Sequence, residues 1–324
     1  MAEIGKDIDK AKAILEKGEL VAIPTETVYG LAGNALNQDA VAKIFAVKSR
    51  PSFDPLILHT SDLERIHEFV SDIPEPLEKL ALAFCPGPLT LLLPKKSLVP
   101  DLVTSGLETV AVRVPDHPLT QALLASLSFP LAAPSANPFG YISPTKASHV
   151  NDQLGKKIEY ILDGGDCQVG VESTIVGMEG DEVIVYRLGG LDLRSIESIV
   201  GKVEVMAHSS SDPKSPGMLK SHYAPRKPLI LGDLDKLVPV YRSKGENIGV
   251  LAFRSVYPEL LGQFQIQLSP SGDLTEAAKN LFAAMRALDS MDVSVILSEE
   301  VPDVGLGKAI NDRLRRAAAQ EIEE

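Results

Sequence analysis

Short apolar stretches alternate with amphipathic stretches along the first two hundred residues. The segment 8–17 has apolar residues at helical spacing and stops at Gly18, so it predicts a helix, and 40–47 predicts a second. The apolar stretches that predict strands are 20–23, 56–59, 90–93, 110–114, 131–133, 160–162, 174–176 and 183–186. This alternation indicates an α/β domain with helices on the faces of a sheet.

A polar stretch rich in Ser and Pro, 209–217, interrupts the pattern and is typical of an extended linker. After it, strands are expected at 229–231, 248–253 and 293–297, and helices at 274–288 and 308–319. Strands that alternate with helices in this way predict a smaller, Rossmann-like domain. We therefore expect a first domain at 1–205, a linker at 206–227 and a second domain at 228–324.

Composition and charge narrow the classes of function. The chain has 324 residues and a net charge of −12, and this charge disfavours a polyanion as a tightly held partner. Its 2 cysteines provide neither a disulfide framework nor a zinc site. The start of the chain is charged and no apolar run is long enough to cross a membrane, so we expect a cytoplasmic protein.

The basic residues of the acidic first domain stand near strand ends. Lys48 and Arg50 close a predicted helix, where cations can complement the helix dipole. Pro51 and Pro55 predict that 52–54 is extended and that the two cations point away from the sheet. Paired cations of this kind suit a phosphate group.

Two further arginines lie in or at the end of predicted strands. Arg113 stands inside an apolar strand, where a buried guanidinium needs an anion. Asp116, Glu108 or a substrate carboxylate would supply it. Arg187 ends a strand just before a Gly-Gly turn, an arrangement that suits an anionic ligand.

Polar side chains also gather after the strand at 131–133. Ser135, Asn137 and Ser143 are typical of an oxyanion or metal-phosphate site, although caps and turns use the same residue types. Thr145 is expected to cap a helix. His59 ends a strand that faces the region of Lys48 and Arg50.

Several familiar catalytic motifs are missing from the sequence: the Gly-rich phosphate loop with Lys-Ser/Thr, the Gly-x-Ser-x-Gly elbow and His-Glu-x-x-His. Ser143-Pro-Thr-Lys146 imitates part of a serine acylase site but lacks the Lys-Thr-Gly that accompanies it. Two alternatives stay open at this point. One is a serine acylase that uses Ser143, and the other is an RNA-binding module that uses the basic cluster.

The ordered motifs, taken together, resemble the threonylcarbamoyl-AMP synthase family in its long, two-domain form. They are Pro24-Thr-Glu-Thr-Val-Tyr-Gly30, Lys48-x-Arg50-Pro51 with Pro55-Leu-x-x-His59, Pro134-Ser-Ala-Asn137, Glu172-Ser-Thr174, Arg187-x-Gly189, Ser215-Pro-Gly-Met218, His222-Tyr-Ala-Pro225 and Gly305-Leu-Gly-Lys-Ala-Ile310. The resemblance covers essentially the whole chain.

This resemblance implies a nucleotidyltransferase that makes threonylcarbamoyl-AMP and pyrophosphate from L-threonine, bicarbonate or CO₂, and ATP. The product serves the modification of the adenosine next to the anticodon of tRNA, through further tRNA-modification proteins. The resemblance also implies a concave catalytic domain with a twisted mixed sheet, Mg²⁺ bound with ATP, and a linker that covers the active site.

The resemblance also assigns site residues. Threonine would contact Thr27, His59, Arg113 and Ser173, with Arg113 on its carboxylate. The nucleotide would contact Lys48, Arg50, Asp54, Thr109, Ser135, Asn137, Ser143, Arg187 and Tyr223. Lys48, Arg50 and Arg113 would carry the catalytic charge, and Mg²⁺ would lie near Ser135 and Asn137.

Overall fold

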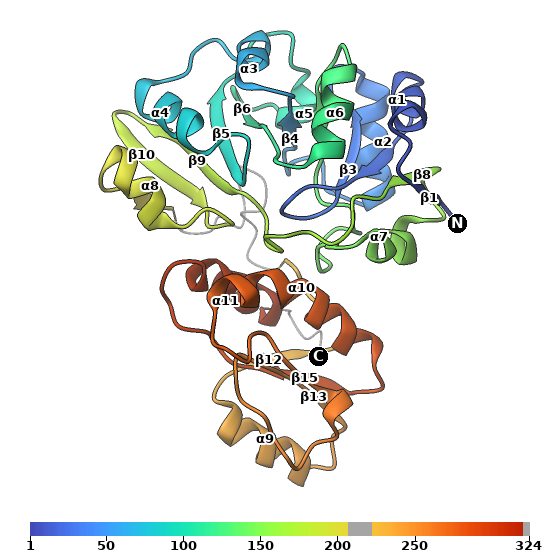
Figure 1. The fold of residues 1–324 in the computed structure, drawn as a ribbon, viewed down its shortest axis with the longest axis vertical. Coiled ribbons are helices and arrows are strands. Elements are labelled where there is room, and N and C mark those ends of the chain that lie inside the picture. The colour runs from blue at the N-terminus through green and yellow to red at the C-terminus, as the bar shows by residue number, and fades with distance from the viewer. Residues whose placement is uncertain (207–221, 320–324) are drawn as a thin grey trace. The chain divides into compact units, whose positions relative to one another are not determined.

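The structure is a computed structural model and describes residues 1–206 and 222–319 (Figure 1). The chain divides into two compact units. The first comprises Met1–Phe139, Ser143–Gln168 and the described part of Glu172–Leu219, and the second comprises Gly140–Ile142, Val169–Val171 and the described part of Lys220–Glu324. Most of the expected linker lies outside the described residues.

The first unit is built on a mixed sheet in the order β1-β8-β2-β3-β7-β4-β6-β5-β9-β10-β11. Its strands are β1 (Glu3–Gly5), β2 (Val21–Ile23), β3 (Gly30–Asn34), β4 (Ile57–His59), β5 (Leu89–Pro94), β6 (Thr109–Arg113), β7 (Leu131–Ala132), β8 (Tyr160–Leu162), β9 (Thr174–Glu179), β10 (Glu182–Arg187) and β11 (Glu204–Val205). Its helices are α1 (Ile8–Glu16), α2 (Gln38–Lys48), α3 (Leu63–Phe69), α4 (Glu75–Phe84), α5 (Asp101–Thr104), α6 (Pro118–Ser126), α7 (Ala147–Leu154) and α8 (Leu193–Val200). The expected mixed α/β fold is confirmed.

The two faces of strands β4, β6, β5, β9 and β10 differ in what covers them. Val110 and Val112 of β6 pack into the large core beneath α3, α4, α5 and α8 (Figure 1). Because side chains alternate along a strand, Ala111 points to the opposite face, where it joins a small apolar cluster with Ile57 and Leu92. The predicted site residues of these strands share this second face.

The second unit has a parallel sheet in the order β12-β15-β13-β14. Its strands are β12 (Leu229–Leu231), β13 (Ile248–Ala252), β14 (Gln265–Gln267) and β15 (Val295–Ser298), and its helices are α9 (Leu234–Ser243), the 3₁₀ turn η1 (Gly262–Phe264), α10 (Leu274–Ser290) and α11 (Gly307–Ala318). Parallel strands joined through helices agree with the Rossmann-like architecture that the sequence predicts. No described helix is both long and apolar enough to cross a membrane.

Some elements and one local detail differ from the prediction. Strands β1, β3, β11 and β14 and helices α3, α4, α5, α6, α8 and α9 were not predicted. β3 was missed because its sequence, Gly-Leu-Ala-Gly-Asn, lacks β-branched residues, and a Cβ at Gly33 would lie 2.8 Å from Leu20 Cδ2. Thr145 does not cap α7, because Lys146 is the N-cap residue and makes no side-chain capping bond.

Candidate active site

Polar residues of β4, β5 and β6 meet at one end of the less covered sheet face. In the parallel pairing of β4 with β6, His59 lies opposite Arg113. In the antiparallel pairing of β5 with β6, Thr90 lies opposite Arg113. Because direct cross-strand partners point to the same face, the three side chains share it with Ala111 and Leu92. The strand register itself therefore assembles this group.

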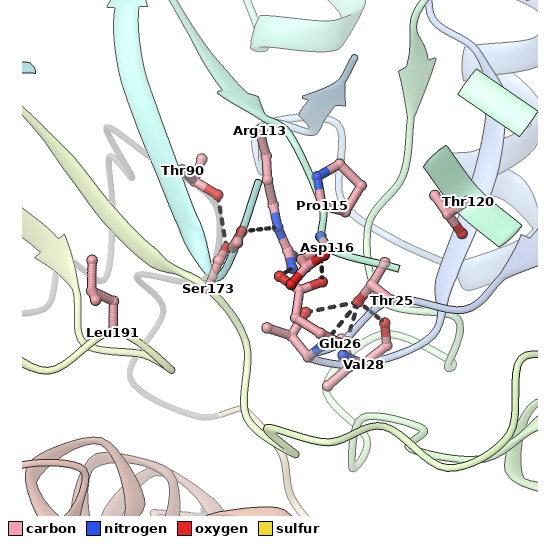
Figure 2. Close-up of polar contacts among 12 residues, drawn as sticks. Thr25, Glu26, Val28, Thr90, Arg113, Pro115, Asp116, Thr120, Ser173 and Leu191 are labelled. Atoms are coloured by element: carbon pink, nitrogen blue, oxygen red, sulfur yellow. Dashed lines mark hydrogen bonds and ion pairs between the residues drawn. The ribbon is translucent and has the colours of Figure 1, made fainter. Parts of the chain in front are cut away.

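Arg113 is buried, and its anionic partner is Glu26. Nη2 of Arg113 lies 2.6 Å from Oε1 of Glu26, and Nε donates to the carbonyl of Gly87 at 3.4 Å (Figure 2). Of the three anions predicted from the sequence, Asp116 and Glu108 are wrong, and the substrate carboxylate stays a prediction. Asp116 uses its backbone N–H, which donates to Oε2 of the same Glu26 at 3.1 Å.

The loop that carries Glu26 is shaped by Thr25. The Thr25 hydroxyl accepts hydrogen bonds from the backbone N–H groups of Thr27 and Val28 and donates to the carbonyl of Val28 at 2.6 Å (Figure 2). A Thr side chain that bonds its own loop in this way replaces the regular backbone bonds of a helix or strand. Its hydroxyl also lies 2.8 Å from that of Thr27, which is fully buried.

A second set of contacts links β5, Ser173 and Arg187. The Ser173 hydroxyl lies 2.7 Å from that of Thr90. Arg187 donates from Nε to the Ser173 carbonyl and from Nη2 to the Ser173 hydroxyl, both at 3.0 Å. Ser173 is therefore held between Thr90, which is cross-strand to Arg113, and the Arg187 guanidinium.

Lys48 and Arg50 turn inward, contrary to the expectation that they point away from the sheet. Ser49 ends α2 in the left-handed conformation, with φ 54°, and 51–54 forms a turn in which Asp54 N donates to the Pro51 carbonyl. Arg50 donates to the carbonyls of Asp54 and Pro55 at 3.0 and 2.7 Å, and its Nη2 lies 2.9 Å from Asp54 Oδ1. The carbonyls of this turn accept hydrogen bonds from the guanidinium, so the Arg50 side chain lies against the turn and does not extend away from the sheet.

The Lys48 ammonium lies over the segment that follows β7. Nζ donates to the backbone carbonyls of Ser135 and Asn137, and the side chain is almost fully buried. Burial lowers the pKa of Lys48 well below its usual value, Arg50 lowers it further, and Asp54 opposes the shift. Ser135 itself is placed by a bridge to Gly30 at the start of β3.

Ser143 does not have the surroundings of a serine acylase nucleophile. Its hydroxyl donates to the Glu172 carboxylate at 2.5 Å, and both residues are buried. Lys146, which would serve as the base, pairs with Asp166 at 2.8 Å near the surface. The lysine base of the acylase pattern is therefore engaged by Asp166, and this geometry speaks against the acylase alternative.

The opposite end of the same sheet face holds a cavity of about 330 Å³. Its lining combines apolar and polar side chains: Leu92, Leu107, Glu108, Thr109, Met178, Glu179 and Tyr186. Thr109 and Arg113 begin and end β6, so they are about 13 Å apart at roughly 3.3 Å per residue. In the parallel register of β4 with β6, Ile57 lies opposite Ala111. Pro55 precedes Ile57 by two residues, as Thr109 precedes Ala111, so the Arg50 contact with the Pro55 carbonyl lies toward the Thr109 end of the face.

His59 is held in its neutral form. Burial lowers the pKa of His59 from 6.5 to about 3, and the charge of nearby Arg113 adds to the shift, while hydrogen bonds to the backbone of Ile57 and Leu131 oppose it. A neutral imidazole can donate or accept one hydrogen bond without bringing a further positive charge toward Arg113.

Tyr223 lies in the second unit. It has a φ of 66° and stacks on Phe282, with ring centroids 5.4 Å apart. The guanidinium carbons of Arg313 and Arg316 lie 5.4 and 4.8 Å from its ring centroid. Its assignment to the nucleotide stays a prediction.

Sequence reasoning missed Glu26, Thr90 and Glu172 as members of the site. The sequence did contain a signal for Glu26 as a site residue. It lies just after a buried strand in a loop that has no other charge, and a carboxylate in such a place needs a cation. Thr90 carried none, because a Thr in a strand is ordinary.

The chemistry of the site is that of small-anion binding. Lys48, Arg113 and the side chain of Arg50 are at most 5% exposed, so they suit an enclosed ligand better than an RNA duplex. Among residues 1–206 and 222–319, no group of three or more His, Cys, Asp or Glu is placed to hold a metal ion. Mg²⁺ near Ser135 and Asn137 would use side-chain oxygens, because both backbone carbonyls accept from Lys48.

The mixed sheet and its buried cations are the features of an α/β enzyme domain that is suited to small anionic ligands, and it is joined to a second α/β domain. Two family models match the chain: one described as "Telomere recombination" at residues 13–189, and one described as "Threonylcarbamoyl-AMP synthase, C-terminal domain" at 191–319.

Similar proteins extend over nearly the full length. A threonylcarbamoyl-AMP synthase of Pyrococcus abyssi is 40% identical over 96% of this chain and 94% of its own, and one of Bacillus subtilis is 40% identical over 97% and 94%. A crystal structure of P. abyssi Sua5 complexed with L-threonine matches with a TM-score of 0.92 at 38% identity, over 98% of this chain and 97% of that one. The chain belongs to the threonylcarbamoyl-AMP synthase family and is an enzyme.

The low pKa of His59 predicts a specific dependence of stability on pH. Its folded pKa lies below the unfolded value, so its contribution is complete above pH 6.5 and is lost as the pH falls toward about 3. Between pH 6.5 and 5 the parent protein should lose about 2 kcal/mol of unfolding free energy more than His59→Gln, at about 1.4 kcal/mol per pH unit. Denaturant unfolding at several pH values measures this difference, with His67→Gln, at an exposed position, as the control. Equal pH slopes for the parent and His59→Gln would contradict the pKa.

Proposed function

We propose that the protein makes threonylcarbamoyl-AMP and pyrophosphate from L-threonine, bicarbonate or CO₂, and ATP, and that this product serves the modification of tRNA next to the anticodon. The observation that carries the proposal is the arrangement along β6, with a buried cation and hydroxyl groups at one end of the strand and a cavity lined by apolar and polar side chains at the other. The names of the similar proteins support the same reaction.

The threonine end requires a carboxylate site with polar groups around it. Arg113 would hold the threonine carboxylate, because a guanidinium pairs with a carboxylate through two parallel hydrogen bonds. Thr27, Ser173 and neutral His59 would contact the rest of the amino acid. Two observations support these roles. His59 is the cross-strand neighbour of Arg113, and Ser173 is held by hydrogen bonds with Thr90 and Arg187.

The nucleotide end requires a site for the base and cations for the phosphates. The cavity beside Thr109 is large enough for an aromatic base and has Leu92 and Tyr186 among its walls. Lys48, Arg50 and Arg187 would bind the phosphates, with Asp54, Ser135, Asn137 and Ser143 close to them. Tyr223 is kept as a predicted contact of the nucleotide. Mg²⁺ would enter with ATP and supply charge neutralisation on its phosphates.

The reaction balances without a covalent enzyme intermediate. The threonine amine adds to CO₂ and loses a proton, which gives a carbamate. A carbamate oxygen then attacks the α-phosphorus, the bond to the bridging oxygen of the β-phosphate breaks, and pyrophosphate leaves. Because two anions must meet, the protein's contribution is charge stabilisation and positioning, which is how such transfers are generally catalysed.

Pyrophosphate release tests the proposal. With ATP and Mg²⁺, the purified protein should release pyrophosphate only when both threonine and bicarbonate are present. Release that does not depend on threonine, or no release at all, would contradict the proposed reaction.

Arg50 gives a residue-level test. Arg50→Ala should slow turnover roughly a hundredfold, because loss of one preorganised cationic donor costs about 3 kcal/mol of transition-state stabilisation. Arg194→Ala, at an exposed position of α8, is the control and should stay within threefold of the parent. Steady-state pyrophosphate release measures both variants, and an Arg50→Ala rate within threefold of the parent would remove Arg50 from the mechanism.

A further inference from the structure

Glu26 stands beside the proposed threonine site but has no assigned role in it. Its side chain and that of Arg113 are 9% and 5% exposed, and they form an ion pair at 2.6 Å. The question is what a buried carboxylate does on the arginine that, under the proposed function, must bind the carboxylate of a substrate.

The geometry of the guanidinium separates the two carboxylates. Arg113 donates from Nε to the Gly87 carbonyl and from Nη2 to Glu26. Nε and Nη2 together form one edge of the planar guanidinium. Among the described residues, Nη1 makes no hydrogen bond, so the end-on edge that contains Nη1 is left for a ligand. Glu26 and a substrate carboxylate can therefore bind the same guanidinium along different edges.

Glu26 is itself fixed by the structure around it. Its Oε2 accepts from the backbone N–H of Asp116, in the segment that follows β6. Its backbone lies in the turn that the Thr25 hydroxyl closes, and Thr120 of α6 donates to the Pro24 carbonyl just before that turn. The Glu26 carboxylate therefore links the loop after β2 to the Arg113 side chain and to the backbone of the segment that follows β6 (Figure 2).

We propose that Glu26 is a positioning residue for threonine binding: it holds Arg113 by the Nε–Nη2 edge, so that the Nη1 end points toward the carboxylate of the amino acid. A long Arg side chain has many rotamers, and fixing one before the ligand arrives removes that entropic cost from binding. The inference rests on the proposed function, because it assigns threonine to Arg113.

The alternative for Glu26 is competition with the substrate. If Glu26 occupied the place of the threonine carboxylate, it would have to leave before threonine bound, and its removal would tighten binding. The two roles therefore predict changes of opposite sign in the apparent affinity for threonine.

Glu26→Gln is the main variant. Gln keeps one oxygen acceptor for Arg113 but loses the charge and the second oxygen that Asp116 N–H uses. We expect the KM for threonine to rise at least tenfold, with the KM for ATP within threefold of the parent. Glu19→Gln, which removes a half-exposed partner of Lys43, is the matched control and should leave both constants unchanged.

Glu26→Asp serves as a second variant in case the amide destabilises the fold. Asp keeps the charge but is one methylene shorter, so it cannot reach both anchors at once, and its threonine KM should lie between those of the parent and Glu26→Gln. Thermal unfolding and the ATP KM establish that each variant is folded.

A double-mutant cycle shows whether the effect acts through Arg113. In an Arg113→Lys background, Glu26→Gln should change the threonine KM by less than threefold, because the oriented guanidinium is already gone. A full tenfold change in that background, an unchanged KM in both single variants, or a lower KM would overturn the proposal. If the parent itself shows no threonine-dependent turnover, the proposed function fails, and calorimetric titration with threonine then decides this inference. An affinity for threonine that is equal in the parent and in Glu26→Gln would overturn it.

Discussion

The burial of one positive charge at the end of a central strand shapes the rest of this site. The Arg113 guanidinium is removed from water at a place where the chain must provide an anion and hydrogen-bond acceptors, because an unpaired buried charge is very costly. Glu26 and the Gly87 carbonyl meet that need along one edge of the group. The remaining edge is the place where we propose that the substrate carboxylate binds.

The strand register extends this local constraint over the whole sheet face. Pairing of β4 and β5 with β6 places His59 and Thr90 opposite Arg113, and the alternation of side chains puts Thr109 on the same face at the far end. The face therefore has the Arg113–Glu26 pair at one end and, at the other, a cavity lined by apolar and polar side chains. We propose that the two ends take the amino acid and the nucleotide. Chemistry between two anions needs such fixed charges more than it needs a nucleophile.

Sequence reasoning predicted the parts of this site that local pattern determines. The apolar strands were recognisable from their composition, and an arginine within one of them signalled a buried anion partner. The partner itself was not predictable, because Glu26 and Arg113 are 87 positions apart and their contact depends on which strands are neighbours. Strand β3 was missed because Gly33 serves close packing against Leu20. The inward turn of Arg50 depends on carbonyls that the fold supplies.

We propose that the carboxylate of the amino-acid substrate binds to Arg113. Calorimetric titration of the protein with threonine and with threoninamide measures the contribution of this carboxylate, because the amide keeps the amine and the hydroxyl but has no carboxylate charge. Threonine should bind at least a hundredfold more tightly than threoninamide. Equal affinities for the two compounds would show that Arg113 does not bind the carboxylate.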